Sequence, residues 1–189
     1  MLRDLLTKNR SFRSFDPEVK ISKDELLDMI DTTRLCPSSA NLQSLKFRPV
    51  YEENEVKAVF SATKWAGYLS SMEIPPKGHE PAAFIIVAND TDIAPNTTPF
   101  FKDTGIASHT ILLRACEMGY NGCMIGSFNK DIIKNELNMK ENLEITLVIA
   151  LGKGDEEIVL CDDENGIKYY REDSVHYVPK RKLSDIIAE

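Results

Sequence analysis

The residues best suited to chemistry lie in two short segments near the start of the chain. In residues 9–15, Arg10 and Arg13 bracket Ser11, and two guanidinium groups three positions apart on a helix can converge on one anion. In residues 37–43, Pro37 precedes compact polar side chains that suit hydrogen bonding to a flat polar ring, namely Ser38, Ser39, Asn41 and Gln43. Together the two segments predict a phosphate-bearing aromatic cofactor, which supplies chemistry that side chains alone do not perform.

Two later segments could complete such a site. Lys180 and Arg181 belong to a compact cluster of cations in an otherwise acidic protein. Gly122 and Gly126 flank a short apolar stretch, and glycine permits a ligand to approach the backbone closely. Each segment also fits an ordinary role, which is a solvated basic surface for the cations and a tight strand end for the glycines.

Composition narrows the classes of protein that the chain can be. Its 189 residues fit one domain, residues 1–189, with a sizeable core. The net charge of −7 argues against nucleic acid as the main partner, because phosphate backbones attract basic surfaces. The four cysteines form no CxxC or metal-binding pattern, so we expect free thiols in a reducing compartment. The cysteine pattern also leads us to expect no metal site. With neither a secretory signal nor a membrane-spanning apolar run visible, we expect a cytoplasmic protein.

A well-marked helix leads into the polar segment 37–43. Ser22 and Glu25 have the spacing of a capping box, which predicts that a helix starts after Ser22. Pro37 would end it, and its apolar face would comprise Leu26, Leu27, Ile30 and Leu35. The polar segment is therefore expected to form the loop that leaves this helix, at a position where binding loops are common.

Six apolar runs are strand candidates: residues 46–51, 82–88, 123–125, 145–151, 158–161 and 167–170. The second and fourth runs are continuously apolar, which is typical of strands buried on both faces. Asn165 and Gly166 lie between the last two runs and form a common hairpin-turn pair. We expect an exposed hairpin there, without a role in chemistry.

The longest helical stretch covers about residues 102–118 and is followed by Gly119, a typical C-cap residue. Its small and apolar side chains predict burial on most sides, either within its own domain or partly against a second subunit. Asn129 would cap a short helix over residues 130–137, and a last helix would cover residues 183–188. Helices and strands are mixed without a dinucleotide-binding fingerprint, which predicts an α+β fold or a nonstandard α/β sandwich.

In their order along the chain, these segments resemble those of the nitroreductase family of FMN-dependent oxidoreductases. That family opens with an Arg-Arg-Ser-x-Arg-x-Phe stretch, which is similar to residues 9–15, and continues with a Pro-Ser-Ser-x-Asn-x-Gln-Pro loop, which is similar to residues 37–43. Its Gly-x-Gly-like turn after the long helix is similar to residues 119–122. A Lys/Arg pair before a last Leu-x-x-Ile-Ile helix is similar to residues 180–187.

The resemblance implies an α+β fold with a mixed or antiparallel central sheet flanked by helices, and a homodimer with two FMN sites between the subunits. The residues implied to bind FMN are Arg10, Ser11, Arg13, Pro37, Ser38, Ser39, Asn41, Gln43, Ile125, Gly126, Ser127, Lys180 and Arg181. The arginines, Ser11 and the C-terminal cations would hold the phosphate and ribityl chain. The 37–43 loop would come from the other subunit, and the backbone of residues 125–127 would lie against the reactive edge of the flavin. The chain departs from the family pattern at Asn9 and Ser44, in place of an arginine and a proline.

The implied activity is a ping-pong reaction in which NADH or NADPH reduces FMN and an electron-poor acceptor, such as a nitroaromatic or a quinone, is then reduced. No catalytic side chain is expected, because the flavin carries the chemistry. One alternative is a non-catalytic flavin-binding or flavin-storage protein, which NAD(P)H would not bleach rapidly. Another is a domain without flavin, which would be colourless when purified.

Residues 63–80 have no counterpart in the resemblance, and they hold the only tryptophan. This excursion could be a lid that places Trp65 or Tyr68 over the flavin, where they would contact substrate. It could equally be a surface excursion whose aromatic rings pack on the core. His109 and His176 are expected to have structural roles.

Overall fold

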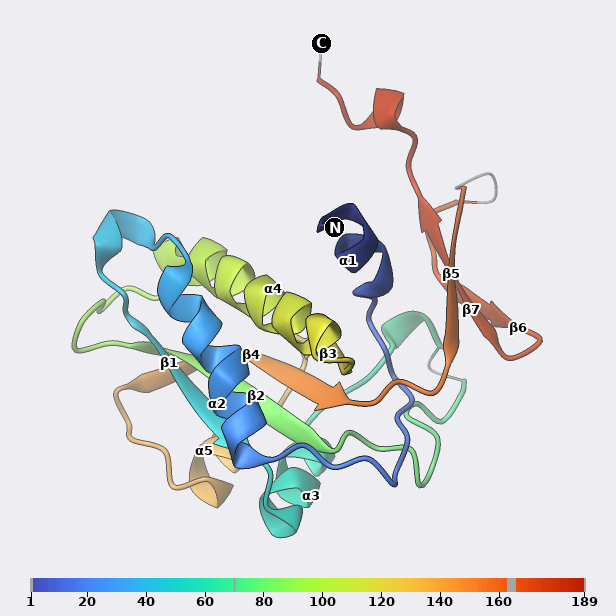
Figure 1. Ribbon diagram of the computed structural model, residues 1–189. Coiled ribbons are helices and arrows are strands. Elements are labelled where there is room, and N and C mark those ends of the chain that lie inside the picture. The colour runs from blue at the N-terminus through green and yellow to red at the C-terminus, as the bar shows by residue number, and fades with distance from the viewer. Residues whose placement is uncertain (1, 70, 163–165, 189) are drawn as a thin grey trace.

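An antiparallel sheet of four strands forms the centre of the molecule (Figure 1). The structure is a computed structural model that describes residues 2–69, 71–162 and 166–188. Every neighbouring pair of strands is antiparallel, so the predicted α+β fold with an antiparallel central sheet is confirmed. The two longest strands occupy the middle, and their continuous apolar runs reflect burial on both faces. In spatial order the strands are β1 (Leu45–Val50), β2 (Ala83–Asp90), β4 (Leu143–Gly152) and β3 (Asn121–Ile125).

Helices cover both faces of this sheet (Figure 1). Successive side chains of β2 alternate between two cores, so that Ile85 joins Ile111 on one face and Phe84 joins Val59 on the other. Asn129 caps the helix Lys130–Glu136 as predicted, because its side chain accepts a hydrogen bond from a backbone N–H in the first turn. The helices are α2 (Lys23–Asp31) and α4 (Phe101–Glu117) on the first face, and α3 (Glu53–Ser61) and α5 (Lys130–Glu136) on the second.

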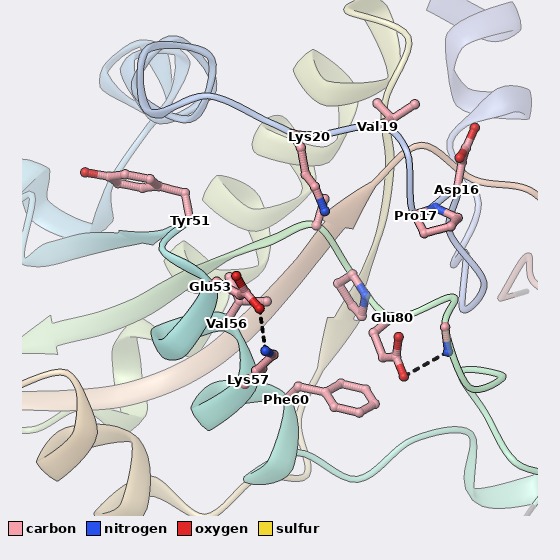
Figure 2. A pocket seen from close by; sticks show the side chains of 13 residues that line it. Asp16, Pro17, Val19, Lys20, Tyr51, Glu53, Val56, Lys57, Phe60 and Glu80 are labelled. Atoms are coloured by element: carbon pink, nitrogen blue, oxygen red, sulfur yellow. Dashed lines mark hydrogen bonds and ion pairs between the residues drawn. The ribbon is translucent and has the colours of Figure 1, made fainter.

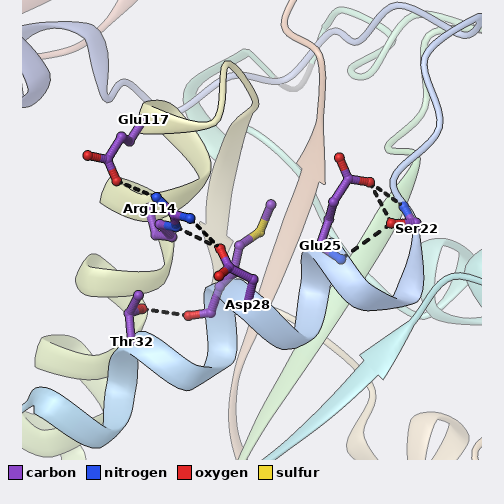
Figure 3. Close-up of polar contacts among 7 residues, drawn as sticks. Ser22, Glu25, Asp28, Thr32, Arg114 and Glu117 are labelled. Atoms are coloured by element: carbon purple, nitrogen blue, oxygen red, sulfur yellow. Dashed lines mark hydrogen bonds and ion pairs between the residues drawn. The ribbon is translucent and has the colours of Figure 1, made fainter.

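The capping box predicted at the start of α2 is present (Figure 3). The Ser22 hydroxyl accepts a hydrogen bond from the Glu25 backbone N–H (3.3 Å), and the Glu25 carboxylate accepts one from the Ser22 N–H (2.8 Å). The apolar face differs from the prediction, because Met29 is buried whereas Leu27 and Leu35 are 42% and 88% exposed. The α-helix gives way to a tighter 3-10 turn before Leu35, and this change of pitch takes the side chain off the buried face.

Helix α4 is joined to α2 across the first face of the sheet (Figure 3). The Arg114 guanidinium lies 2.7 Å from the Asp28 carboxylate. Gly119 follows the helix with a φ of +88°, as expected for a C-cap glycine. Burial of α4 within the chain is incomplete, since Phe101 and Ile106 are 54% and 39% exposed. Two large apolar side chains of this helix therefore face outward.

A smaller second sheet holds the C-terminal part of the chain (Figure 1). In spatial order it consists of β5 (Glu157–Asp162), β7 (Val175–Lys180) and β6 (Tyr170–Glu172), with β5 and β7 parallel. The predicted hairpin between residues 158–161 and 167–170 is wrong, because β7 lies between the two strands. An Asn-Gly pair favours a turn only locally. All six residues of β5 pair with β7, whereas β6 is only three residues long. Asn165 of the predicted turn lies outside the described residues.

Both ends of the chain lie outside the central layers (Figure 1). Helix α1 (Leu2–Lys8), which no sequence pattern indicated, contacts α4. The predicted helix over residues 183–188 is wrong, because the segment forms only a 3-10 turn, Leu183–Asp185. Ile186 and Ile187 are largely exposed, and a short helix without packing is marginal in water. Across the described residues, we find no helix with the length and apolar character needed to cross a membrane.

Candidate functional site

The segment that carries Arg10 and Arg13 is extended and lies along the edge strand β3. Ser11 forms a parallel bridge with Gly122, and the Phe12 N–H donates to the Gly122 carbonyl (3.1 Å). A side chain at Gly122 would collide with the Ala150 carbonyl of β4 and would lie 2.6 Å from a methyl of Leu112 in α4. Glycine thus lets β3 sit tightly between its neighbours, and the two arginines are held at a fixed place beside it.

Four of the residues predicted to bind the cofactor phosphate line one pocket of about 310 Å³. Arg10, Ser11 and Arg13 meet Lys180 there, although Lys180 lies at the end of β7. Arg181 is not among the lining residues. The other lining residues are Asn9, His109, Leu112, Met124, Tyr169, His176 and Val178. We call this cavity the cation pocket; it contains Asn9 where the family pattern has a further arginine.

The side chains of the two arginines are held differently. The Arg10 guanidinium donates to the Leu6 carbonyl (2.6 Å), while its buried Nε has no hydrogen-bond partner in the described part of the chain. Burial lowers the pKa of Arg10 from its ordinary value. Arg13 Nη1 lies 3.2 Å from the Ser11 carbonyl and 3.4 Å from His176 Nε2, and its guanidinium carbon lies 5.0 Å from the centre of the Tyr169 ring.

A buried ion pair anchors Arg13 to the second sheet. The Arg13 backbone N–H donates to the Glu156 carboxylate, which also pairs with Arg171. Burial raises the pKa of Glu156, although the hydrogen bond from Arg13 and the charge of Arg171 oppose that shift. Burial, reinforced by the charges of Arg13 and Arg171, lowers the pKa of His176 to about 4. The histidine is therefore neutral near pH 7.

The loop of residues 37–43 is fastened by Asp103, a residue that the sequence analysis did not single out. The Asp103 carboxylate accepts hydrogen bonds from the Ser39 N–H (2.8 Å), the Ser39 hydroxyl (2.7 Å) and the Ser38 hydroxyl (3.2 Å). Burial raises the pKa of Asp103, but the bonds from Ser39 and Ser38 outweigh this effect, so the net shift is downward. The sequence signal for this role was the acidic residue in the first turn of the long helix.

The same loop has an unusual backbone. Ala40, Asn41 and Gln43 have φ values of +51°, +53° and +50°. Residues other than glycine adopt this left-handed conformation at a cost, although asparagine tolerates it well. The hydrogen bonds to Asp103 offset that cost and fix the loop in one shape.

The loop and the cation pocket do not meet within one chain. The loop lines a different pocket, of about 480 Å³, together with side chains from α2, β1 and α4. None of the described residues that line this pocket also lines the cation pocket. Asn41 and Gln43 are exposed at the rim of the loop.

The third predicted segment leaves the end of β3. Ile125 is buried, whereas Gly126 and Ser127 are exposed. The Ser127 carbonyl accepts a hydrogen bond from the Lys64 N–H (2.9 Å), so the excursion of residues 63–80 holds this backbone in place. Ser127 and Lys64 line a pocket of about 520 Å³.

The two aromatic residues of this excursion each contact another aromatic ring. Trp65 lies 6.1 Å from the ring of Phe60 in the second core, and its Nε1 donates to the Thr63 hydroxyl (2.9 Å). Tyr68 is 60% exposed, and its ring lies 5.1 Å from that of Tyr169, a residue of the cation pocket. The excursion is thus packed on the core at Trp65 and reaches the candidate site through Tyr68.

A separate pocket of about 510 Å³ lies between α3 and the segments of residues 16–20 and 78–82 (Figure 2). Its charges are mixed, with Lys20 facing inward and Lys57 paired to Glu53. It contains none of the residues predicted to bind a cofactor. Among the described residues, no group of three histidine, cysteine or acidic side chains is placed to hold a metal ion.

Comparison with known proteins agrees with this fold. A model of the nitroreductase family matches residues 6–153, and the chain belongs to that family. The expected class, an oxidoreductase enzyme, is thereby confirmed. YdgI of Bacillus subtilis strain 168, which is named as an NAD(P)H nitroreductase, is 27% identical over 187 aligned positions, and the match covers 82% of this chain and 88% of that protein.

Solved structures of the family share the arrangement of helices and strands. An FMN-dependent nitroreductase from Clostridium difficile R20291 has a TM-score of 0.64 at 24% identity, and the match covers 81% of this chain and 87% of that one. A nitroreductase family protein from Streptococcus pneumoniae TIGR4 has a TM-score of 0.74 at 15% identity over 100% of both chains. The second match includes the C-terminal sheet, which lies beyond the residues covered by the family model.

Proposed function

We propose that this protein is an FMN-dependent oxidoreductase that takes hydride from NADH or NADPH and reduces an electron-poor small molecule, such as a nitroaromatic or a quinone. The observation that carries the proposal is the convergence of Arg10, Arg13 and Lys180 on one pocket. Membership of the nitroreductase family supports it, as do relatives named as an NAD(P)H nitroreductase and an FMN-dependent nitroreductase.

The cation pocket has the donors that a phosphate monoester requires. Two guanidinium groups and an ammonium can supply charge-assisted hydrogen bonds, and the buried Arg10 Nε has no partner among residues 2–69, 71–162 and 166–188. We infer that these three side chains bind the phosphate of FMN, with Arg181 beside them and Ser11 on the ribityl chain. Bound FMN supplies alternating hydride transfer from the nicotinamide and to the acceptor, which gives ping-pong kinetics.

The remaining predicted residues would act at the ring. The backbone of residues 125–127 is exposed from Gly126 onward, and we assign it to the reactive edge of the flavin. Ser38 and Ser39 direct their hydroxyl hydrogens to Asp103. We therefore assign contact with the flavin to the backbone of the loop after Pro37 and to the side chains of Asn41 and Gln43.

A homodimer would bring the two halves of the site together. The 37–43 loop and the cation pocket are separate within one chain, and α4 exposes the apolar side chains of Phe101 and Ile106. We infer that these side chains pack against a second copy, whose 37–43 loop then faces the first copy's flavin. Each subunit would be one domain spanning residues 1–189. The four free cysteines suit the reducing cytoplasm, where we place the activity.

The substrate would meet the excursion of residues 63–80. Tyr68 is the exposed aromatic residue of that excursion, and its contact with Tyr169 places it beside the cation pocket. We assign Tyr68 to the substrate side of the flavin and Trp65 to holding the excursion on the core.

An absorbance spectrum tests the proposal directly. The purified protein, reconstituted with FMN if necessary, should be yellow, and NADH or NADPH should bleach the bound flavin without oxygen. Addition of a nitroaromatic or a quinone should restore the colour. A flavin that binds but is not bleached would favour a storage protein, and failure to bind FMN would contradict the proposal.

A further inference from the structure

His176 lies in the cation pocket but has no role in the proposed function. His176 lines that pocket, is 1% exposed and lies 5.4 Å from the ring of Tyr169. Its Nδ1 atom is buried and has no hydrogen-bond partner among the residues that the structure describes. A buried polar atom without a partner is costly, so such an atom beside a ligand pocket points to a missing partner.

The neighbours of His176 determine which ring nitrogen carries the proton. Arg13 Nη1 lies 3.4 Å from Nε2. A guanidinium can only donate hydrogen bonds, so Nε2 must be the acceptor in this contact. The charges of Arg13 and Arg171 and the burial of the ring disfavour a second proton on the imidazole. The hydrogen must therefore be on Nδ1, which is an unpaired donor.

The pocket offers this donor one class of partner. Arg10, Arg13 and Lys180 make it suitable for an anion with several oxygens. Glu156, the nearby carboxylate, is occupied by Arg171 and by the Arg13 backbone. A phosphate oxygen can accept from a neutral N–H as well as from cations, and the neutral donor adds a bond without adding repulsion among the cations.

We propose that His176, as the neutral tautomer with its hydrogen on Nδ1, donates a hydrogen bond to the phosphate of FMN. The inference rests on the proposed function, because it requires FMN in the cation pocket. The proposal predicts that His176 contributes to the affinity only for a flavin that carries a phosphate. A histidine that only packs in the second sheet would affect the affinity for every flavin equally.

Binding of FMN and of riboflavin to the apoprotein separates these cases, because riboflavin lacks the phosphate. His176→Gln retains an acceptor near the Nε2 position, and His176→Asn retains a donor near the Nδ1 position. We expect His176→Gln to bind FMN about tenfold more weakly with unchanged riboflavin affinity, and His176→Asn to retain most of the FMN affinity. Affinities would be measured from the quenching of flavin fluorescence.

Two patterns would overturn the proposal. Equal losses for FMN and riboflavin would show a packing role, and rescue by Gln rather than by Asn would show that His176 only holds Arg13. A wild-type protein that binds neither flavin would instead contradict the proposed function itself.

Nuclear magnetic resonance of wild-type apoprotein with ¹⁵N-labelled histidine gives a test that needs no substitution. We expect a protonated Nδ1 at neutral pH, with a signal that shifts on addition of FMN but not of riboflavin. A hydrogen on Nε2, or equal shifts with both flavins, would contradict the proposal.

Discussion

Asp103 and Ser39 are joined by two hydrogen bonds, one from the Ser39 N–H (2.8 Å) and one from its hydroxyl (2.7 Å). Asp103 lies in the first turn of α4, the helix that exposes Phe101 and Ile106. The loop proposed to reach the flavin and the surface proposed to join the subunits are therefore parts of one rigid unit. A substitution at the subunit interface should therefore also alter the contacts between this loop and the flavin ring.

Removal of the Asp103 carboxylate should loosen the loop. Asp103→Ala leaves the Ser38 and Ser39 donors without an acceptor, and we expect the free energy of unfolding to fall by about 1–3 kcal/mol. Asp103→Asn keeps one acceptor oxygen, so its free energy of unfolding should lie between those of the wild type and Asp103→Ala. Denaturant unfolding and FMN titration would measure both effects. Unchanged stability in Asp103→Ala would show that the left-handed loop holds its shape without this anchor.

The lowered pKa of Asp103 also gives a pH dependence. Its carboxylate is bound in the folded state, so the stabilisation is fully present above the unfolded value of about 3.9 and is lost as pH falls through the lower folded value. The loss of stability of the wild type below about pH 4 should therefore be steeper than that of Asp103→Asn. Parallel curves would contradict the assigned role.

The cations that line the cation pocket should contribute more to FMN binding than a cation close by in the sequence that does not line it. Lys180 lines the cation pocket, whereas Lys182 does not. Lys180→Ala, Arg10→Ala and Arg13→Ala should each weaken FMN binding by roughly 1.5–3 kcal/mol, through loss of a charge-assisted bond. Lys182→Ala is the matched control and should bind FMN as the wild type does. Equal effects at Lys180 and Lys182 would indicate only a general electrostatic attraction.

The sequence predicted most of the central architecture, because its signals there were strong and local. The capping box at Ser22 and the two continuous apolar strands needed no tertiary information. The meeting of Arg13 with Lys180 was predicted from the two clusters of cations and from the family resemblance, since no local pattern links the two ends of a chain.

The errors arose where tertiary contacts decide the outcome. Whether Leu35 is buried depends on the change from α to 3-10 geometry, and the partner of β5 depends on competition between two later strands. Asp103 and His176 were missed as site residues because one buried carboxylate or imidazole leaves no periodic signal in a sequence.

Two isoleucines of similar exposure distinguish the proposed interface from the rest of the surface. Ile106 on α4 is 39% exposed, and Ile132 on α5 is 42% exposed on the opposite side of the sheet. Ile106→Glu should convert the proposed dimer to a monomer and release flavin, because a charge would be buried at the apolar contact. Ile132→Glu should do neither. Sedimentation at low micromolar concentration is the measurement, and a wild-type monomer that retains flavin would refute the shared site.

Mixing two damaged proteins tests whether one site uses residues of both chains. Asn41→Ala and Arg13→Ala should each lower the rate of flavin reduction, since they remove contacts from the ring and from the phosphate. If the residues serve one site from different subunits, exchange creates some sites with both residues intact, and activity should partly return. Demonstrated exchange without recovery would place both residues on the same chain's flavin.

His176 should make folding sensitive to mild acid. Its folded pKa of about 4 lies below the unfolded value near 6.5, so the unfolded chain gains a proton first as pH falls. The stability contributed is complete above pH 6.5 and is lost toward pH 4, by about 3 kcal/mol at full extent. His176→Gln should lack this slope in denaturant unfolding. A variant with the same slope would assign it to another group.

The position of the cation pocket has a consequence for the chain as a polymer. Its cations come from residues 10–13 and from residue 180, so an anion held by all of them connects two points near opposite ends of the sequence. Such a ligand acts as a reversible cross-link that closes nearly the whole chain into one loop. An unfolded chain would have to close this long loop before it could bind the same anion with all of these cations, and the entropic cost grows with loop length. The anion therefore binds the folded chain alone and stabilises it by mass action.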